Sequence, residues 1–260
     1  MKQRIITGIV AAALFLPIVV YGGIPFILLT YILATIALSE LYRMKQFSLL
    51  SFHGVTSLLL LWGLLLPNEQ SEWLFSGNIS KMEMLFLGVL LLLTYTVVTK
   101  NEYTFEDVGF SLLSLLYIGI GFYYFIEARL AGLHYIFYAL FIIWATDTGA
   151  YFFGRAFGKR KLWPDISPNK TVEGSIGGVV SALIVAFIFQ LFVQIDQTII
   201  GLTVMTVVVS IFGQIGDLVE SAFKRHFRIK DSGKILPGHG GILDRFDSLL
   251  FILPLLHFFY

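Results

Sequence analysis

The sequence contains no cysteine, so disulfide bonds, thiol catalysis and thiolate metal sites are excluded. Its five histidines are scattered and form no close pair, which argues against a zinc site. Charge is also scarce, because only 13% of the 260 residues are charged, whereas a soluble domain carries about 25%. The net charge of +1 gives no sign of a nucleic-acid partner, and we expect none.

Long uncharged runs take the place of the missing charge. Hydrophobic residues make up 57% of the chain, and the mean hydropathy is +0.82. The runs are continuously apolar rather than alternating, and lipid offers the backbone no hydrogen bonds, so we expect helices. The sequence therefore predicts an all-α polytopic membrane protein. Nine spans are expected, at residues 5–21, 24–41, 55–66, 84–98, 110–127, 135–153, 175–193, 199–219 and 248–260.

Two features of these runs guide their interpretation. The first run is longer than the apolar core of a secretory signal, so we interpret it as a retained span. The third and last runs are short, and Pro254 could kink the last one. With nine spans, 16 of the 18 Lys and Arg residues fall on one side of the membrane, and only Lys81 and Arg129 on the other. This distribution predicts a cytoplasmic N-terminus and an outward C-terminus.

The two halves of the chain differ in character. Residues 1–133 have short connectors and few charges within spans, so we interpret them as variable scaffold helices. Residues 134–260 contain nearly all the glycine-rich and charge-dense segments, and we interpret them as the catalytic region. No internal repeat is visible, which weakens a transporter built from inverted repeats.

The densest group of polar residues spans residues 221–247. The segment starts as an extension of the eighth span, breaks at Asp231-Ser232-Gly233 and turns again at residues 237–241. Glycines around His239 permit unusual backbone angles and an anion-binding turn. Six cations that match phosphate oxygens lie in the segment, namely Lys224, Arg225, Arg228, Lys230, Lys234 and Arg245. A basic loop ordinarily reflects topology alone, but here acids are interleaved with the bases.

The acids of this region share helix faces with polar neighbours. One face of the eighth helix is expected to carry Asp217, Glu220, Ser221 and Lys224. Asp217 lies in an otherwise apolar stretch, where a charge costs roughly 2.5–3.5 kcal/mol unless it faces a cavity or a partner. Asp244 and Asp247 share a face if the last helix begins there. Separated carboxylates beside phosphate-binding cations suit a magnesium–triphosphate site.

A second polar segment covers residues 144–174. Asp147 lies within the sixth span, where it could serve the site or simply pair with a lysine or a backbone group inside the bundle. It shares a predicted helix face with Ala150, Tyr151 and Gly154. A basic loop follows, and Thr171 is expected to start the seventh helix beside Lys170, which makes a phosphate site. Gly174, Gly177 and Gly178 are expected to be close-packing contacts.

The residues of these two segments resemble the phosphatidate cytidylyltransferase family, also called CDP-diacylglycerol synthases. The family pattern is matched by Ser221, Lys224-Arg225, Lys230-Asp231, Gly233, Pro237, His239-Gly240-Gly241 and Asp244-Arg245-Phe246-Asp247. Residues 147–151, 167–171 and 173–174 are also similar to the family. The motif resemblance covers about residues 144–247, and the earlier spans match only as hydrophobic helices.

The resemblance implies that CTP and phosphatidate react to give CDP-diacylglycerol and pyrophosphate, in phospholipid biosynthesis. It implies Mg2+ as cofactor, a homodimer, and an active site at the cytoplasmic face of a bacterial cell membrane. By resemblance, Asp217 and Asp244 are the expected metal ligands. The expected catalytic residues are Lys224, Arg225, Ser221, Asp247 and Asp147, the two acids also being second choices for the metal. The expected substrate-binding residues are Lys170, Ser167, Lys230, His239, Gly240, Gly241 and Arg245.

Two other functions stay open at this point. The first is a CTP-dependent polyisoprenol or phytol kinase, a related membrane family for which the motif match over residues 230–247 would be weaker. A transporter for an anionic solute would be expected to show repeats and charges spread through the helix bundle, and the sequence shows neither.

Overall fold

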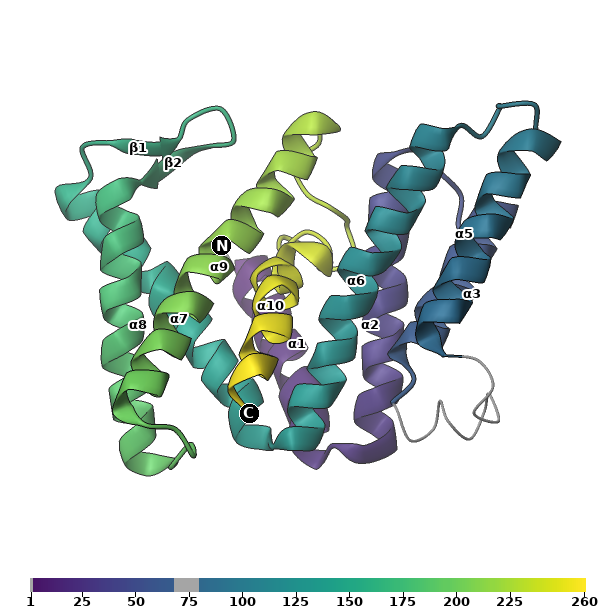
Figure 1. The fold of residues 1–260 in the computed structure, drawn as a ribbon. Coiled ribbons are helices and arrows are strands. Elements are labelled where there is room, and N and C mark those ends of the chain that lie inside the picture. The colour runs from purple at the N-terminus through teal and green to yellow at the C-terminus, as the bar shows by residue number, and fades with distance from the viewer. Residues whose placement is uncertain (1, 68–79) are drawn as a thin grey trace. The chain divides into compact units, whose positions relative to one another are not determined.

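The computed structural model describes residues 2–67 and 80–260, apart from the side chains of Lys2, Arg4 and Ile5. The described residues form nine α-helices, a two-stranded hairpin and a final 3-10 turn (Figure 1). In chain order the elements are α1 (Lys2–Tyr21), α2 (Gly23–Met44), α3 (Phe52–Leu65), α5 (Lys81–Val98), α6 (Phe105–Ala131), α7 (Leu133–Phe157), β1 (Lys161–Trp163), β2 (Ser167–Thr171), α8 (Val172–Phe192), α9 (Ile199–His226), α10 (Leu243–Leu256) and η1 (His257–Phe259).

Each of the nine predicted spans corresponds to one of these helices. Within the described ranges, six helices are long and apolar enough to cross a membrane, namely α2, α5, α6, α7, α8 and α9. The apolar parts of α1 and α3 are shorter, and α10 has 14 residues with Pro254 inside it. The expectation of an all-α polytopic membrane protein is confirmed, while a crossing by all nine helices stays a prediction.

Two helices continue well beyond their predicted apolar spans. α7 runs to Phe157 and α9 to His226, so each carries the polar residues that follow its apolar part. The last turn of α9 is basic, with Lys224, Arg225 and His226, and positive side chains are favoured at the C-terminal end of a helix. The expected extension of the eighth span is therefore confirmed, and several candidate residues lie on this one helix.

The chain forms two compact units. The first contains Met1–Ile126 together with Ser232–Ile242, and the second contains Glu127–Asp231 together with Leu243–Tyr260. The loop Ser232–Ile242 thus belongs with the N-terminal helices, although both of its ends continue into the second unit. The functional division into residues 1–133 and 134–260 stays a prediction.

The first unit is held by packing between its apolar helices and by a few buried hydrogen bonds. Tyr42 of α2 is fully buried, and its hydroxyl donates to Ser57 Oγ of α3 at 2.7 Å. Gly88 of α5 faces Leu60 of α3, and a Cβ at Gly88 would overlap the Leu60 side chain. Small residues at such contacts let membrane helices approach closely.

In the second unit, α7 and α8 pack through glycine. A Cβ on Gly178 would lie 2.8 Å from the carbonyl oxygen of Thr146, and one on Gly177 would overlap Phe153. The expected close-packing role of these glycines is confirmed. Two buried hydroxyl pairs then link α7 to α9, Tyr138 with Thr206 at 2.7 Å and Thr146 with Ser210 at 2.8 Å.

Candidate active site

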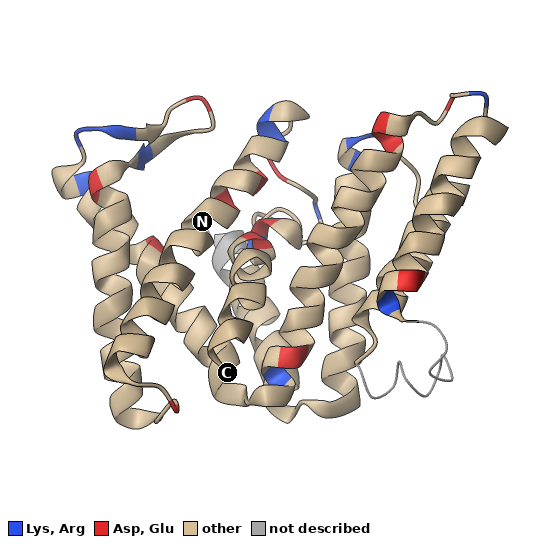
Figure 2. Ribbon diagram, in the orientation of Figure 1, with Lys and Arg blue, Asp and Glu red and all other residues tan. Residues whose placement is uncertain are grey.

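A short hairpin, formed by β1 and β2, closes one end of the second unit. Its strands pair antiparallel, and Glu173 of α8 accepts hydrogen bonds from the backbone N–H groups of Lys159 and Arg160 at its base. Thr171 is the N-cap of α8, and its hydroxyl accepts from Gly174 N at 3.1 Å, as the sequence predicted. Figure 2 shows most of the Lys and Arg residues of this unit at the end that carries the hairpin.

A cavity of about 500 Å3 lies between α7, α8, α9 and the hairpin. Its lining includes Asp147, Ala150, Tyr151 and Gly154, the four residues predicted to share one face of α7. Its other polar lining residues are Arg155, Asn169, Lys170, Thr171, Ser175, Gln214 and Asp217. The cavity thus gathers acids, bases and amides that lie far apart in the sequence.

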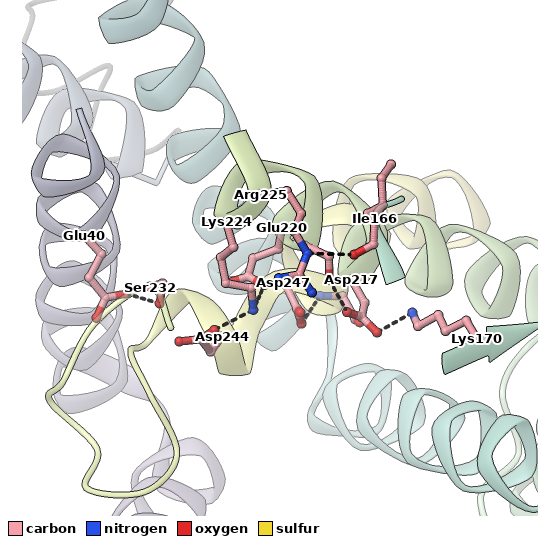
Figure 3. A network of polar contacts seen from close by, with 12 residues as sticks. Glu40, Ile166, Lys170, Asp217, Glu220, Lys224, Arg225, Ser232, Asp244 and Asp247 are labelled. Carbon is pink, nitrogen blue, oxygen red and sulfur yellow. Dashed lines mark hydrogen bonds and ion pairs between the residues drawn. The ribbon is translucent and has the colours of Figure 1, made fainter. Parts of the chain in front are cut away.

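One ion pair crosses this cavity. The ammonium group of Lys170 pairs with a carboxylate oxygen of Asp217, and the two side chains are 27% and 33% exposed (Figure 3). Ser221 lies one helical turn after Asp217 and donates to its second oxygen at 3.4 Å. Asp147 interacts electrostatically with both members of the pair. Asp217 and Asp147 therefore face the cavity, which removes the cost of placing them against lipid.

A second group of charges centres on Lys224. Its ammonium group pairs with Glu220 one turn earlier in α9 and with Asp244 Oδ1 of α10 at 2.8 Å (Figure 3). The Glu220 side chain is fully buried and that of Asp244 is 5% exposed. One cation, the ammonium group of Lys224, therefore pairs with both acids. Glu220 was expected on this face of the helix but was not singled out as a site residue.

Asp247 interacts electrostatically with members of both groups of charges. The pKa of its carboxyl is raised to about 7, chiefly by burial and then by the nearby carboxylates of Asp217 and Asp147, while Lys224 acts in the opposite direction. The approach of α9 to α10 is close here, since a Cβ on Gly216 would lie 2.8 Å from the carbonyl oxygen of Asp247. Three acids of the second unit, Asp147, Asp217 and Asp247, thus lie within electrostatic reach of one another.

The remaining cations take different positions. Arg225 is exposed, and its Nε donates to the carbonyl oxygen of Ile166 at 3.2 Å, so it ties the end of α9 to the hairpin. Lys230 and Arg245 are exposed, and Ser167 is half-buried in β2.

The glycine–histidine turn belongs to the first unit. Gly238 and Gly240 have φ values of 79° and 85°, so the predicted unusual backbone angles are confirmed at these two glycines. The turn is closed by His239 N donating to the carbonyl oxygen of Leu236 at 2.8 Å and by Leu236 N donating to that of Gly240 at 3.0 Å. The His239 ring lies beside Gly8 of α1.

Sequence reasoning missed one residue that contacts this loop. Glu40 of α2 is 2% exposed and accepts a hydrogen bond from Ser232 (Figure 3). It also accepts one from the backbone N–H of Ile242. Its partners lie 192 and 202 residues further along the chain, so no local pattern in the sequence indicated these contacts. An acid within a predicted membrane helix was the one available signal.

The acids of the second unit offer oxygen ligands of the kind that Mg2+ prefers. No group of three or more His, Asp or Glu side chains is arranged to hold a metal ion in the part of the chain that the structure describes. Mg2+ is usually bound by one or two carboxylates, with substrate phosphates and waters completing its shell, so such a group is not required. The carboxylates of Asp217 and its neighbours therefore fit this ion chemically.

The chain is similar to known proteins along its whole length. It matches the cytidylyltransferase family over residues 2–260. It is 58% identical to the phosphatidate cytidylyltransferase of Bacillus subtilis (strain 168), with 99% of this chain and 97% of that protein covered. The phosphatidate cytidylyltransferases of Staphylococcus haemolyticus (strain JCSC1435) and Staphylococcus aureus (strain COL) are 52% and 49% identical, with 99% of this chain and 98% of each relative covered. The chain therefore belongs to the phosphatidate cytidylyltransferases of the cytidylyltransferase family, as its motifs predicted.

Proposed function

We infer that this protein is the enzyme that transfers CMP from CTP to phosphatidate, giving CDP-diacylglycerol and pyrophosphate. The observation that carries this inference is the 58% identity to a phosphatidate cytidylyltransferase across 99% of the chain, including the complete pattern of residues 221–247. Family membership also removes the anion transporter as an alternative. The protein acts as an integral membrane protein in phospholipid biosynthesis.

Cytidylyl transfer to phosphatidate requires neutralisation of negative charge more than it requires a strong base. The phosphate of phosphatidate is already a nucleophile near neutral pH, so the obstacle is the approach of two anions and the charge that develops on the leaving pyrophosphate. Lys170 and Lys224 each neutralise carboxylates in the second unit. We propose that these lysines also bind substrate phosphates, with Ser221 orienting Asp217.

The finer proposal concerns the metal ion. Asp217 and Asp244 are the proposed Mg2+ ligands, with Asp247 and Asp147 as alternatives. The geometry supports Asp217 most, because it faces the cavity and lies within electrostatic reach of Asp147 and Asp247. A bound Mg2+ would neutralise charge on the triphosphate and on the departing pyrophosphate.

Other substrate contacts are proposed from the motif. We propose that substrate phosphates are bound or positioned by Arg245, Lys230, Ser167 and the His239-Gly240-Gly241 turn. The positive φ values of Gly238 and Gly240, on either side of His239, support this proposal, because backbone of this kind can direct N–H groups toward an anion.

The orientation and assembly of the protein are also proposals. Nine spans would place the basic loops and the cavity at the cytoplasmic face of a bacterial cell membrane. The three relatives described above are bacterial, which supports that location. A homodimer is proposed from the family resemblance, and crosslinking of the protein in membranes would test it.

The activity is tested with purified protein in mixed micelles containing phosphatidate, Mg2+ and CTP labelled in the cytosine ring or the γ-phosphate. Ring label should move into lipid as the γ-label leaves as pyrophosphate. Transfer of γ-label to a polyisoprenol or phytol would instead identify a lipid kinase and contradict the proposal.

A further inference from the structure

A single buried carboxylate holds both ends of the loop Ser232–Ile242. Glu40 lies about one turn before the end of α2 and is 2% exposed. Its Oε2 accepts from the hydroxyl of Ser232 at 3.1 Å, and its Oε1 accepts from the backbone N–H of Ile242 at 2.9 Å. Ser232 and Ile242 are the first and last residues of the loop, so one side chain fixes the base of the loop against α2.

Two glycines of the loop make room for this carboxylate. A Cβ on Gly233 or on Gly241 would overlap the carboxyl group of Glu40. Neither glycine has a positive φ, in contrast to Gly238 and Gly240 at the tip of the loop. Glycine is therefore required at positions 233 and 241 for space and at positions 238 and 240 for backbone conformation. The loop is shaped around Glu40 from both sides.

The burial and the hydrogen bonds of Glu40 indicate its role. A buried charge is costly unless hydrogen bonds satisfy it, and here the donors come from the loop. Because it is buried and both of its oxygens accept bonds from the loop, Glu40 is not placed to touch substrate. What it can control is the conformation of a loop that carries the His239-Gly240-Gly241 turn and ends two residues before Asp244.

We propose that Glu40 is a positioning residue for cytidylyl transfer, which holds the Ser232–Ile242 loop in its active conformation. This rests on the proposed function, because the loop carries the turn assigned to substrate phosphates. Fixing both ends of the loop lowers the number of conformations it can adopt, so its backbone donors are already in place when substrate binds.

The test replaces Glu40 with glutamine in the full-length protein. An amide of the same size can still accept from Ile242 N and can donate to Ser232 Oγ, but it removes the negative charge, so the charge-assisted bonds that hold the loop become neutral bonds of roughly half the strength. We expect kcat to fall by on the order of 10²-fold, since small misplacements of groups near the reaction have effects of that size. KM for phosphatidate should change little, and amide exchange across residues 232–242 should become faster by mass spectrometry.

Two further variants make the result specific. Glu106→Gln is the matched control, because Glu106 is exposed in the first turn of α6 in the same unit, and it should behave like wild type. Ser232→Ala removes one donor and leaves the carboxylate with Ile242 N, so it should show the same changes to a smaller extent. If Glu40→Gln does not fold, Ser232→Ala decides the question by the same measurements.

The outcomes separate this proposal from the proposed function. Unchanged kcat per folded molecule in Glu40→Gln, or unchanged exchange across the loop, would overturn the positioning role. A lower thermal unfolding temperature with normal kcat would likewise reduce Glu40 to a structural residue. Absence of CMP transfer in the wild-type protein would overturn the proposed function instead, and exchange would still report whether Glu40 holds the loop.

Discussion

The ammonium group of Lys170 in β2 pairs with the carboxylate of Asp217 in α9, 47 residues later in the chain. The pair lies in the wall of the cavity, so either charge can also be offered to a ligand there. A substrate phosphate would attract Lys170, and Mg2+ would attract Asp217. Before substrate binds, each of the two charges is neutralised by the other. When substrate binds, both are available in the same cavity.

The metal assignment predicts the effect of removing single carboxylate charges. Asp217→Asn and Asp244→Asn should abolish turnover while the protein still inserts and stays folded, because the amide nearly preserves shape but removes the charge partner of the metal. CMP transfer measured at limiting Mg2+ checks this. Asp165→Asn, in the exposed turn of the hairpin, is the matched control and should keep full activity. Near-normal activity in either of the first two variants would transfer the metal role to Asp247 or Asp147.

The orientation of the protein is predicted from loop charge. Because 16 of the 18 Lys and Arg residues fall on one side of a nine-span arrangement, the N-terminus should be cytoplasmic and the C-terminus outward. Reporter fusions after Lys45, Lys161 and Lys230 should all report the cytoplasm. An external signal at Lys161 or Lys230 would contradict both the orientation and the location of the cavity.

The sequence predicted the helices and one wall of the cavity because these depend on local patterns. Apolar runs define helices, and a spacing of three, four and seven residues was enough to place Asp147, Ala150, Tyr151 and Gly154 together. The pattern of residues 221–247 also led to the correct family.

What the sequence did not predict depends on contacts between distant segments. The hairpin has strands of three and five residues, too short to show a periodic pattern, and β2 contains Pro168. The contacts of Glu40 join residues about 200 positions apart, so no local pattern could indicate them. The same holds for Arg225, whose partner Ile166 lies 59 residues earlier.

That contact of Arg225 gives a prediction for phosphatidate binding. Arg225 was expected from the family resemblance to be a catalytic residue, and its Nε donates to the carbonyl oxygen of Ile166 in the hairpin. We expect Arg225→Ala to raise KM for phosphatidate about fivefold, the equivalent of roughly 1 kcal/mol for one hydrogen bond, with a smaller effect on kcat.

Kinetics in mixed micelles with varied phosphatidate measure this change. Arg228→Ala is the control, because Arg228 is an exposed cation just beyond the same helix end. An equal rise of KM in both variants would mean that general positive charge, rather than support of the hairpin, is what matters.

The last prediction concerns Lys224, which neutralises Glu220 and Asp244 together. Removing it leaves two buried carboxylates without their cation, and breaking a buried pair in this way costs about 3–5 kcal/mol. Lys224→Ala should therefore lower the thermal unfolding temperature in detergent. Because we also assign Lys224 to the triphosphate, whose charge is greatest in the transition state, it should lower kcat much more than it raises KM for phosphatidate.

A double variant separates these two roles of Lys224. Glu220→Gln removes one of the two buried negative charges, so Lys224→Ala combined with Glu220→Gln should regain much of the lost stability. It should not regain kcat, since no cation has returned to the site. If the double variant recovers kcat together with stability, Lys224 serves only to neutralise Glu220 and Asp244, and its proposed contact with the triphosphate is wrong.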